Sequence, residues 1–410
     1  MAKEIKDLVV GMDIGTAKVM AVVAEVLPGG ELRVAGLGVA NALGLKRGVV
    51  VNIDATVASI QEALKEAEMM AACKITSVYT GITGSHIRGQ NSTGMVIVRD
   101  NREVTPVDVA RVVETAKAIN IPNDQRLLLV EPQEFVIDGH EVKEPVGMSG
   151  SRLEVKVHIV TGAGSAAENI LKCVRRCGLE VERLVLNPSA SASAVLTEDE
   201  KSLGVAVVDI GAGTTDVQIY TDGSVRHTAV IPIAGDLITS DIAMALRTPT
   251  KDAEEIKVEY GVAKQLLADP NQAIEVPGLG DRAPRQLNRQ ALAGVIEPRV
   301  EEIFSLVHQV IRGSGYEELL SSGIVLTGGS AVMPGMVELG EDIFLKPVRK
   351  GLPLYAGPLA DMVANPRSAT AMGLLEEARS ARARGLKAAQ QAGSMKTIVG
   401  RAKDWFLGNF

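Results

Sequence analysis

Residues 207–220 read Val-Val-Asp-Ile-Gly-Ala-Gly-Thr-Thr-Asp-Val-Gln-Ile-Tyr. Apolar β-branched residues lead into a bend at 211–213 and alternating residues lead out of it, so the pattern predicts a hairpin. The two glycines of the bend permit positive φ angles, which would let successive backbone N–H groups turn toward one point and hold an anion such as a phosphate. Asp209 ends the first strand, where its carboxylate could hold the waters of a bound Mg²⁺. An ordinary tight turn has the same signature, so this stretch alone leaves both interpretations open.

The same motif occurs near the start of the chain, at residues 8–23, which read Leu-Val-Val-Gly-Met-Asp-Ile-Gly-Thr-Ala-Lys-Val-Met-Ala-Val-Val. Both copies place Asp-Ile-Gly at the end of an apolar strand, continue with Thr, and return as a second apolar strand. Two such bends, carrying Asp13 and Asp209, could close on one nucleotide from opposite sides and share its metal ion, which a single turn could not do. The duplication therefore favours phosphate binding over a tight turn.

Composition indicates an α/β protein with more than one domain. The chain has 410 residues, only 3% of them aromatic, and it is rich in small and aliphatic residues. A formal net charge of −7 argues against general nucleic-acid binding. The first residues contain neither a signal-peptide core nor a cleavage site, and no apolar run approaches the roughly 18 residues of a membrane-spanning helix. We therefore expect a cytoplasmic protein.

Two segments before the second bend define the organisation of the first half. Residues 55–73 read as a helix with Asp54 as its N-cap. From 84 to 161 the pattern changes to strand, helix, strand, strand, which indicates a small inserted domain. Its helix is predicted to begin after Thr105 as N-cap, with Pro at the first helical position, and to run to about Ile119.

Two helices made almost wholly of small residues are predicted to begin at Asn187 and Ser368. Small side chains allow two helices to cross closely, so this pair could form the contact between two lobes and a pivot for their closure. Simple tight packing explains the composition equally well.

A third glycine-rich element follows an apolar strand at residues 323–330, Gly-Ile-Val-Leu-Thr-Gly-Gly-Ser. Because glycine has no side chain, the backbone of such a loop can approach a ligand bound above the sheet, as an adenosine-contacting loop would. Glu254 and Lys257 lie three residues apart on one helix face and could reach the ribose or base, although a surface ion pair explains them as well. No Walker A pattern occurs, which excludes a P-loop. The candidate nucleotide-binding residues are Asp13, Gly15, Thr16, Lys18, Asp209, Gly211, Gly213, Thr214, Thr215, Asp216, Gly235, Glu254, Lys257, Gly328, Gly329, Ser330 and Met333.

The C-terminal tail differs from the rest of the chain. Residues 381–393 have the composition of a flexible linker. In residues 394–410 the apolar residues fall on one face at helical spacing and the basic residues on the other, which is typical of a helix that lies on a membrane surface. From Glu376 onward the chain carries a net charge of +4, against −11 for the remainder, which suits anionic lipid. A terminal helix docked on the protein body is the alternative. The expected membrane-contacting residues are Met395, Lys396, Ile398, Val399, Arg401, Lys403, Trp405, Phe406 and Phe410.

The two Asp-Ile-Gly bends, the small-residue helices and the late Thr-Gly-Gly-Ser loop, in this order, resemble the actin, Hsp70 and sugar-kinase superfamily. Within it the chain resembles the FtsA family of bacterial cell-division proteins over essentially its whole length, most specifically at 11–18, 145–153 and 208–216 and in the amphipathic C-terminus. The resemblance implies an α/β, actin-like two-lobed ATPase fold in which an inserted α+β domain replaces actin subdomain 1B. It implies subdomain IA at 1–83, 162–203 and 363–380, IC at 84–161, IIA at 204–227 and 304–362, and IIB at 228–303.

The same resemblance implies a function in cell division. It implies ATP and Mg²⁺ in the central cleft and polymerisation on the inner face of the cytoplasmic membrane at the septum. It also implies anchoring of the tubulin-like FtsZ ring, with the FtsZ tail at subdomain IIB, and recruitment of later divisome proteins at IC. At the position before the proline of the first small-residue helix, relatives commonly carry an acidic or amide residue, often Glu, whereas this chain has Asn187. An amide cannot act as a general base, so we expect slow ATP hydrolysis or none.

Three rival functions share the superfamily. A pilus-assembly actin-like ATPase has a similar inserted domain, but the terminal Trp-bearing amphipathic helix favours the cell-division family. A small-molecule kinase would need a polar substrate pocket beside the phosphates. An Hsp70-type chaperone would need a β-rich peptide domain after the ATPase lobes, and the sequence leaves no room for one.

Overall fold

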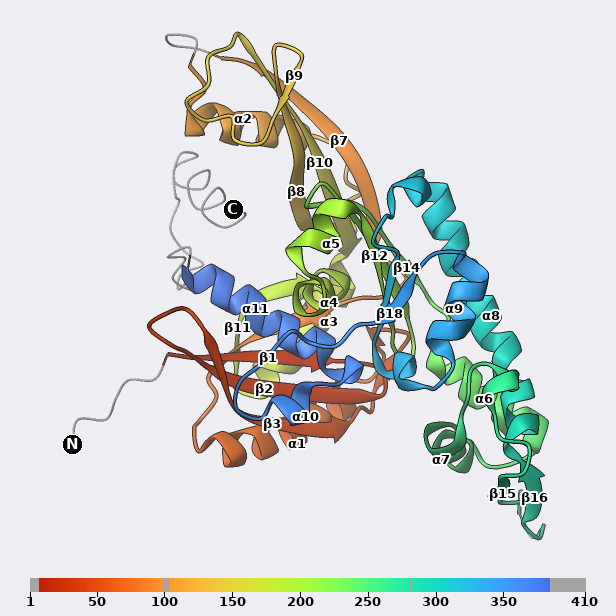
Figure 1. Ribbon diagram of the computed structural model, residues 1–410. Helices are drawn as coiled ribbons and strands as arrows, with labels where there is room; N and C mark the ends of the chain where they lie inside the picture. Colours follow the sequence, from red (N-terminus) through yellow and green to blue (C-terminus); the bar gives the residue numbers. More distant parts are fainter. Residues whose placement is uncertain (1–6, 99–102, 281, 384–410) are drawn as a thin grey trace.

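The computed structural model describes residues 7–98, 103–280 and 282–383, which form two lobes and a smaller domain that projects from them (Figure 1). Each lobe contains a five-stranded sheet, and the projecting domain contains a four-stranded one. Among these residues no helix has both the length and the apolar character needed to cross a bilayer. The predicted α/β class with two lobes is therefore confirmed.

The two lobe sheets are copies of one arrangement. In each, a central antiparallel hairpin has two parallel strands on one side and one antiparallel strand on the other. The first sheet has the order β11 (Glu180–Leu186), β6 (Ser77–Ile82), β1 (Leu8–Ile14), β2 (Lys18–Val26), β3 (Leu32–Asn41). The second has the order β18 (Val348–Lys350), β17 (Ile324–Thr327), β12 (Val205–Ile210), β13 (Thr215–Thr221), β14 (Ser224–Ile231). The repeated sequence motif is thus the central hairpin of each sheet, as predicted.

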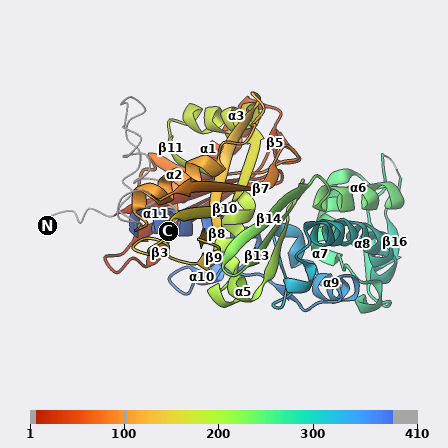
Figure 2. The same cartoon turned by 90° about the horizontal axis from the view of Figure 1, so that it is seen from above.

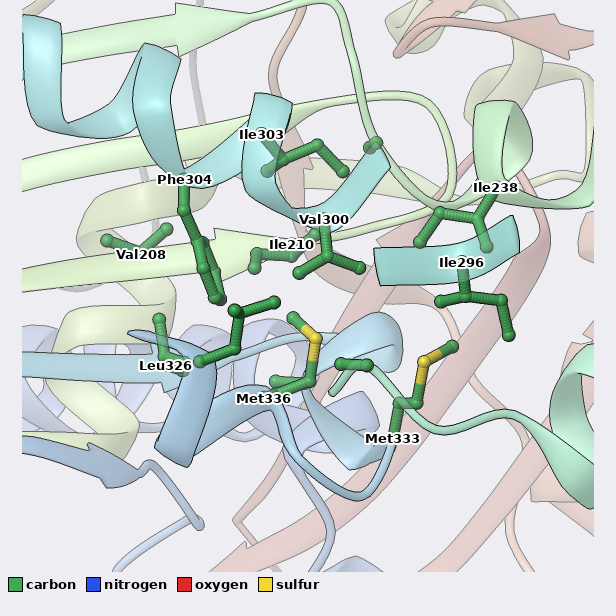
Figure 3. Close-up of a cluster of buried hydrophobic side chains, with 14 of the residues drawn as sticks. Val208, Ile210, Ile238, Ile296, Val300, Ile303, Phe304, Leu326, Met333 and Met336 are labelled. Carbon is green, nitrogen blue, oxygen red and sulfur yellow. The ribbon is translucent and has the colours of Figure 1, made fainter. Parts of the chain in front are cut away.

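Apolar helices cover the outer faces of both sheets. In the first lobe, α1 (Ile53–Ala71) and α3 (Gly164–Arg176) pack on the sheet. In the second, α8 (Arg289–Ser314), α6 (Gly235–Leu246) and α9 (Met336–Phe344) do so. Figure 3 shows Phe304 of α8 pointing between Val208 and Leu326 of the sheet, with Val300 and Ile303 of the same helix in the same apolar cluster. The second lobe ends in α7 (Thr250–Tyr260) and the short hairpin β15 (Ala273–Val276) and β16 (Arg285–Asn288).

The inserted domain has its own core. Its sheet has the order β7 (Arg88–Ile97), β10 (Arg152–Ala163), β8 (Gln125–Ile137), β9 (His140–Val142), and α2 (Pro106–Ala116) packs on one face. Thr105 caps α2 in a capping box with Asp108, as its sequence predicted. The helix ends at Ala116 rather than at about Ile119. Figure 2 shows α2 and this sheet above the first lobe.

One predicted helix start was wrong. Helix α1 begins at Ile53, and its N-cap is Asn52, whose Oδ1 accepts a hydrogen bond from the Ala55 N–H at 3.0 Å. Asp54 lies in the first turn instead, where its negative charge interacts favourably with the positive end of the helix dipole. Asn and Asp are equally good caps, so composition could not choose between the two positions.

Helices α4 (Asn187–Val195) and α11 (Ala369–Ala383) lie between the two sheets and cross closely, as predicted. A Cβ on Gly373 of α11 would lie 1.7 Å from the Ala190 carbonyl oxygen of α4. Backbone therefore packs against backbone at this crossing. Residues 381–383 of the predicted linker belong to α11, while the rest of the linker and the predicted membrane helix at 394–410 lie outside the described residues.

We expect Gly373→Ala to reduce the free energy of unfolding by about 1–3 kcal/mol, because the methyl group forces α4 and α11 apart. Gly313, near the end of α8, is the matched control, since a Cβ there would meet nothing within 4 Å. Gly313→Ala should be neutral or stabilising by up to about 1 kcal/mol, as expected for a helical glycine. Chemical denaturation of both purified variants gives the comparison, and equal midpoints would contradict the close-contact explanation.

Candidate functional site

A cavity of about 480 Å³ lies between the lobes, and both glycine bends border it. The bend between β1 and β2 forms one wall and the bend between β12 and β13 forms the opposite wall. The Thr-Gly-Gly-Ser loop after β17 and the helix α7 also line it. All but two of the candidate residues line this cavity: Asp13, Gly15, Thr16, Lys18, Asp209, Gly211, Gly213, Thr214, Asp216, Glu254, Lys257, Gly328, Gly329, Ser330 and Met333.

Thr215 and Gly235 are the two candidates that do not line the cavity. The Thr215 hydroxyl donates to the Ile233 carbonyl at 2.8 Å, so it points into the protein. Gly235 donates its N–H to the Gly211 carbonyl at 3.1 Å, and its own carbonyl accepts from Lys257 Nζ at 3.2 Å. Both residues therefore lie behind the residues that line the cavity and hydrogen-bond to their neighbours.

The glycines of the second bend serve close approach rather than positive φ, which corrects the expectation from the sequence. Neither Gly211 nor Gly213 has a positive φ angle. A Cβ on Gly213 would lie 2.6 Å from Thr16 Oγ1 of the other bend, so only glycine lets the two bends meet there. Positive φ occurs instead at Gly328 (+86°), where a Cβ would lie 2.2 Å from Asp209 Oδ1.

The two motif aspartates are held differently. Asp13 Oδ2 pairs with Lys18 Nζ at 2.6 Å, within the first bend. Asp209 Oδ2 accepts from the Ser191 hydroxyl at 2.5 Å and from the Thr370 hydroxyl at 3.3 Å, and these hydroxyls belong to α4 and α11. Burial raises the pKa of Asp209, the hydrogen bond from Ser191 opposes this, and the charge of Asp13 adds to it. The helix crossing thus orients the second aspartate.

A third carboxylate, Asp216, joins the lobes. Its Oδ1 accepts from the Thr83 hydroxyl of the first lobe at 2.8 Å. Burial and then the charge of Asp209 raise the pKa of Asp216 to about 8. Carboxylates that raise one another's pKa form a site that a cation would stabilise. In the described part of the chain, no cluster of three or more His, Cys, Asp or Glu is arranged to hold a metal directly, and the sequence predicted only contact through water.

The sequence left open whether Glu254 and Lys257 of α7 form an ion pair or lie beside a ligand site, and in the structure they form an ion pair and border the cavity. Lys257 Nζ and Glu254 Oε2 form an ion pair at 2.6 Å, and both residues line the cavity. Lys257 Nζ also donates to Thr239 Oγ1 at 2.8 Å. The ion pair and a position within reach of a ligand therefore occur together.

Sequence reasoning missed residues at the start of α11. Asn365, Pro366 and Arg367 line the cavity, although their segment was recognised only as the approach to a small-residue helix. Arg367 is exposed, and its Cγ would lie 3.7 Å from a Cβ on Gly329. Of the residues described, none forms an ion pair with Arg367, and no Phe, Tyr or Trp lines the cavity. Asn187 also lines it, with its Oδ1 buried and without a hydrogen-bond partner in the described structure.

Comparison with known proteins identifies the family. A family model described as Cell division protein FtsA matches residues 206–373, and a model described as SHS2 domain inserted in FTSA matches residues 84–161. The cell division protein FtsA of Pseudomonas aeruginosa is 54% identical over 410 residues, with 98% of each chain covered. The chain belongs to the FtsA family. Members of the FtsA family are cell-division proteins, so the resemblance seen in the sequence is confirmed.

Solved structures place this FtsA-family chain in the actin-like fold. The PilM–PilN type IV pilus biogenesis complex aligns with a TM-score of 0.65 at 18% identity, covering 92% of this chain and 98% of the other. MreB 5 of Spiroplasma citri bound to AMPPNP aligns with a TM-score of 0.55 at 16% identity, covering 94% and 100%. Identities this low show the fold alone. The predicted actin-like fold with an inserted domain is thus confirmed, and the family match sets aside the pilus-assembly alternative.

Proposed function

We propose that this FtsA-family protein binds ATP with Mg²⁺ in the cavity between its lobes, polymerises on the inner face of the cytoplasmic membrane at the septum, and anchors the FtsZ ring there. The observation that carries the nucleotide proposal is the meeting of two Asp-bearing glycine bends across one cavity of about 480 Å³. A neighbour of the same fold is described as bound to AMPPNP, which supports the same ligand class.

The residues present fit a magnesium nucleotide. Thr16, Gly213 and Thr214 offer backbone and hydroxyl donors on opposite walls, as a phosphate chain requires. Asp13 and Asp209 would hold the waters of the metal ion. The bound ATP would supply a charged phosphate chain whose length differs from that of ADP.

The far end of the cavity suits the nucleoside. Gly328, Gly329 and Ser330 offer bare backbone, and Glu254, Lys257 and Met333 form the opposite side. Because no aromatic residue lines this cavity in the described chain, the planar guanidinium of Arg367 is the group best able to cover a base.

Surfaces outside the cavity support partner binding. In residues 228–303, the side chains of Met244 and Leu266 are 70% and 83% exposed and do not line the cavity, which suits contact with the FtsZ tail. On the inserted domain, Met95 and Ile97 are exposed on β7, an edge strand, which suits contact with later divisome proteins or with another copy of the chain. The boundaries of the four subdomains stay predictions.

We expect slow ATP hydrolysis or none, because Asn187 offers an amide where a general base would take a proton from water. Steady-state phosphate release by purified protein measures this. Asn187→Glu, which restores a carboxylate, should raise the rate at unchanged ATP affinity, whereas Asn187→Gln should not. A fast rate in the unaltered protein would contradict the expectation.

We expect Arg367→Ala to weaken nucleotide binding roughly three- to thirty-fold, which corresponds to about 0.7–2 kcal/mol of lost stacking. Stacking does not involve the phosphates, so ATP, ADP and adenosine should weaken by a similar factor. Calorimetry with and without Mg²⁺ measures this, and Mg²⁺ should tighten ATP but not adenosine. Arg126→Ala, at an exposed arginine outside the cavity, is the control. Unchanged adenosine affinity in Arg367→Ala would assign the guanidinium to the phosphates instead.

The membrane proposal is tested by sedimentation with anionic liposomes in the presence of FtsZ and ATP. The full chain should carry FtsZ into the pellet, and a chain ending at Gly393 should leave both proteins in the supernatant, because one apolar helix face supplies the attachment. Trp405→Glu with Phe406→Glu should reproduce the loss in the full-length chain, and Asp404→Asn, which alters a polar position only, should not. Unchanged recruitment after truncation would overturn the anchor.

A further inference from the structure

The inserted domain contacts both lobes. It is continuous with the first lobe, because it follows β6 and its strand β10 runs directly into α3. Its base packs against β14 of the second lobe, beside which β7, β8 and β10 rise in Figure 1. The packing is close, since a Cβ on Gly89 of β7 would lie 2.8 Å from the Thr228 carbonyl oxygen of β14. The domain therefore bridges the two lobes.

A chain of side-chain hydrogen bonds crosses this contact. His158 of β10 bonds through Nδ1 to Asn91 Oδ1 at 2.7 Å and through Nε2 to Thr228 Oγ1 at 3.0 Å. Gln218 Nε2 of β13 then donates to Thr228 Oγ1 and to Ser189 Oγ of α4, both at 3.1 Å. His158, Thr228 and Gln218 are buried. We call these five residues the polar chain.

The direction of each bond in the polar chain is determined. The Asn91 side-chain NH₂ donates to the Arg226 carbonyl, so its Oδ1 faces His158 and can only accept. His158 Nδ1 must then carry the proton. Burial lowers the pKa of His158 to about 4, so the ring is neutral near pH 7 and Nε2 accepts from the Thr228 hydroxyl. Displacing one member leaves a buried polar group without its partner, which is unfavourable.

Helix α4 connects the polar chain to the cavity. Ser189 ends the polar chain, and two residues later the Ser191 hydroxyl donates to Asp209 Oδ2 at 2.5 Å. Asn187, two residues earlier, lines the cavity. The same short helix thus contacts the cavity, the buried aspartate and the polar chain.

We propose that the polar chain couples occupation of the cavity to the seating of the inserted domain on the second lobe. This inference rests on the proposed nucleotide binding. A magnesium nucleotide beside Asp209 changes the charge that Ser191 faces, and any resulting shift of α4 moves Ser189 with it. Because the bonds from Ser189 to His158 are directional and pass through the buried side chains of Gln218 and Thr228, that shift reaches His158 and β10. By linkage, a partner that holds the inserted domain changes nucleotide affinity by the same factor.

The test is amide hydrogen exchange on the full chain, with and without ATP and Mg²⁺, read in β7 and β10. The unaltered protein should show a nucleotide-dependent change in both strands. Ser189→Ala removes only the link to α4, at a partly exposed position outside the cavity. It should still bind ATP, as calorimetry measures, but its nucleotide-dependent change in β7 and β10 should fall about threefold or more.

Ser193→Ala is the matched control, since it removes a hydroxyl from the same helix that bonds only to the Ser189 backbone carbonyl. It should behave as the unaltered protein. ATP binding without any change in β7 and β10, or a full change in Ser189→Ala, would overturn the coupling and leave nucleotide binding intact. Failure of the unaltered protein to bind ATP, measured directly by calorimetry, would overturn the proposed function and the coupling with it.

Discussion

The contact between the Gly373 Cα and the Ala190 carbonyl is the constraint on which the rest of the structure depends. It brings α4 and α11 to backbone contact between the two sheets, where larger side chains would separate them. Ser191 of α4 and Thr370 of α11 lie at the same crossing and both hydrogen-bond to Asp209, with 3.0 Å between their own hydroxyl oxygens. One packing contact therefore determines how the lobes meet and where the second aspartate points.

The cavity between the lobes holds buried carboxylates whose charged forms are unfavourable there. Asp13, Asp209 and Asp216 border one cavity, and Lys18 pairs with only the first of them. Burial raises the pKa of the other two, and a neighbouring charge adds to it, that of Asp13 at Asp209 and that of Asp209 at Asp216. This cost is offset by the apolar packing beside the cavity, such as that of Phe304 between Val208 and Leu326. A cation bound in the cavity between the lobes would favour the charged forms of these carboxylates.

The sequence predicted those parts of the site that lie on recurrent local motifs. Asp13, Asp209 and the Thr-Gly-Gly-Ser loop were found because a strand, an acid or glycine and a turn follow one another within a few residues. Arg367 was missed because its position depends on where α11 begins relative to a loop that lies about forty residues earlier in the chain. The role of Gly213 was predicted wrongly for the same reason, because the Thr16 side chain that excludes a Cβ comes from the other lobe. Local pattern thus indicated residues, whereas distances between segments determined their roles.

The base of the inserted domain illustrates why polar contacts between segments escape sequence analysis. Asn91, His158 and Thr228 are isolated polar residues on three strands, and nothing in their spacing predicts that they meet. Their position is nevertheless informative, because β14 is the edge strand of its sheet and needs cover. An apolar contact would cover it as well, and the core of the inserted domain is itself apolar, with Phe135 and Leu153 buried. Apolar surfaces can slide over one another at little cost, whereas a chain of directional hydrogen bonds favours one alignment and penalises the alternatives. The inserted domain therefore folds on apolar packing, while polar contacts align it on the second lobe.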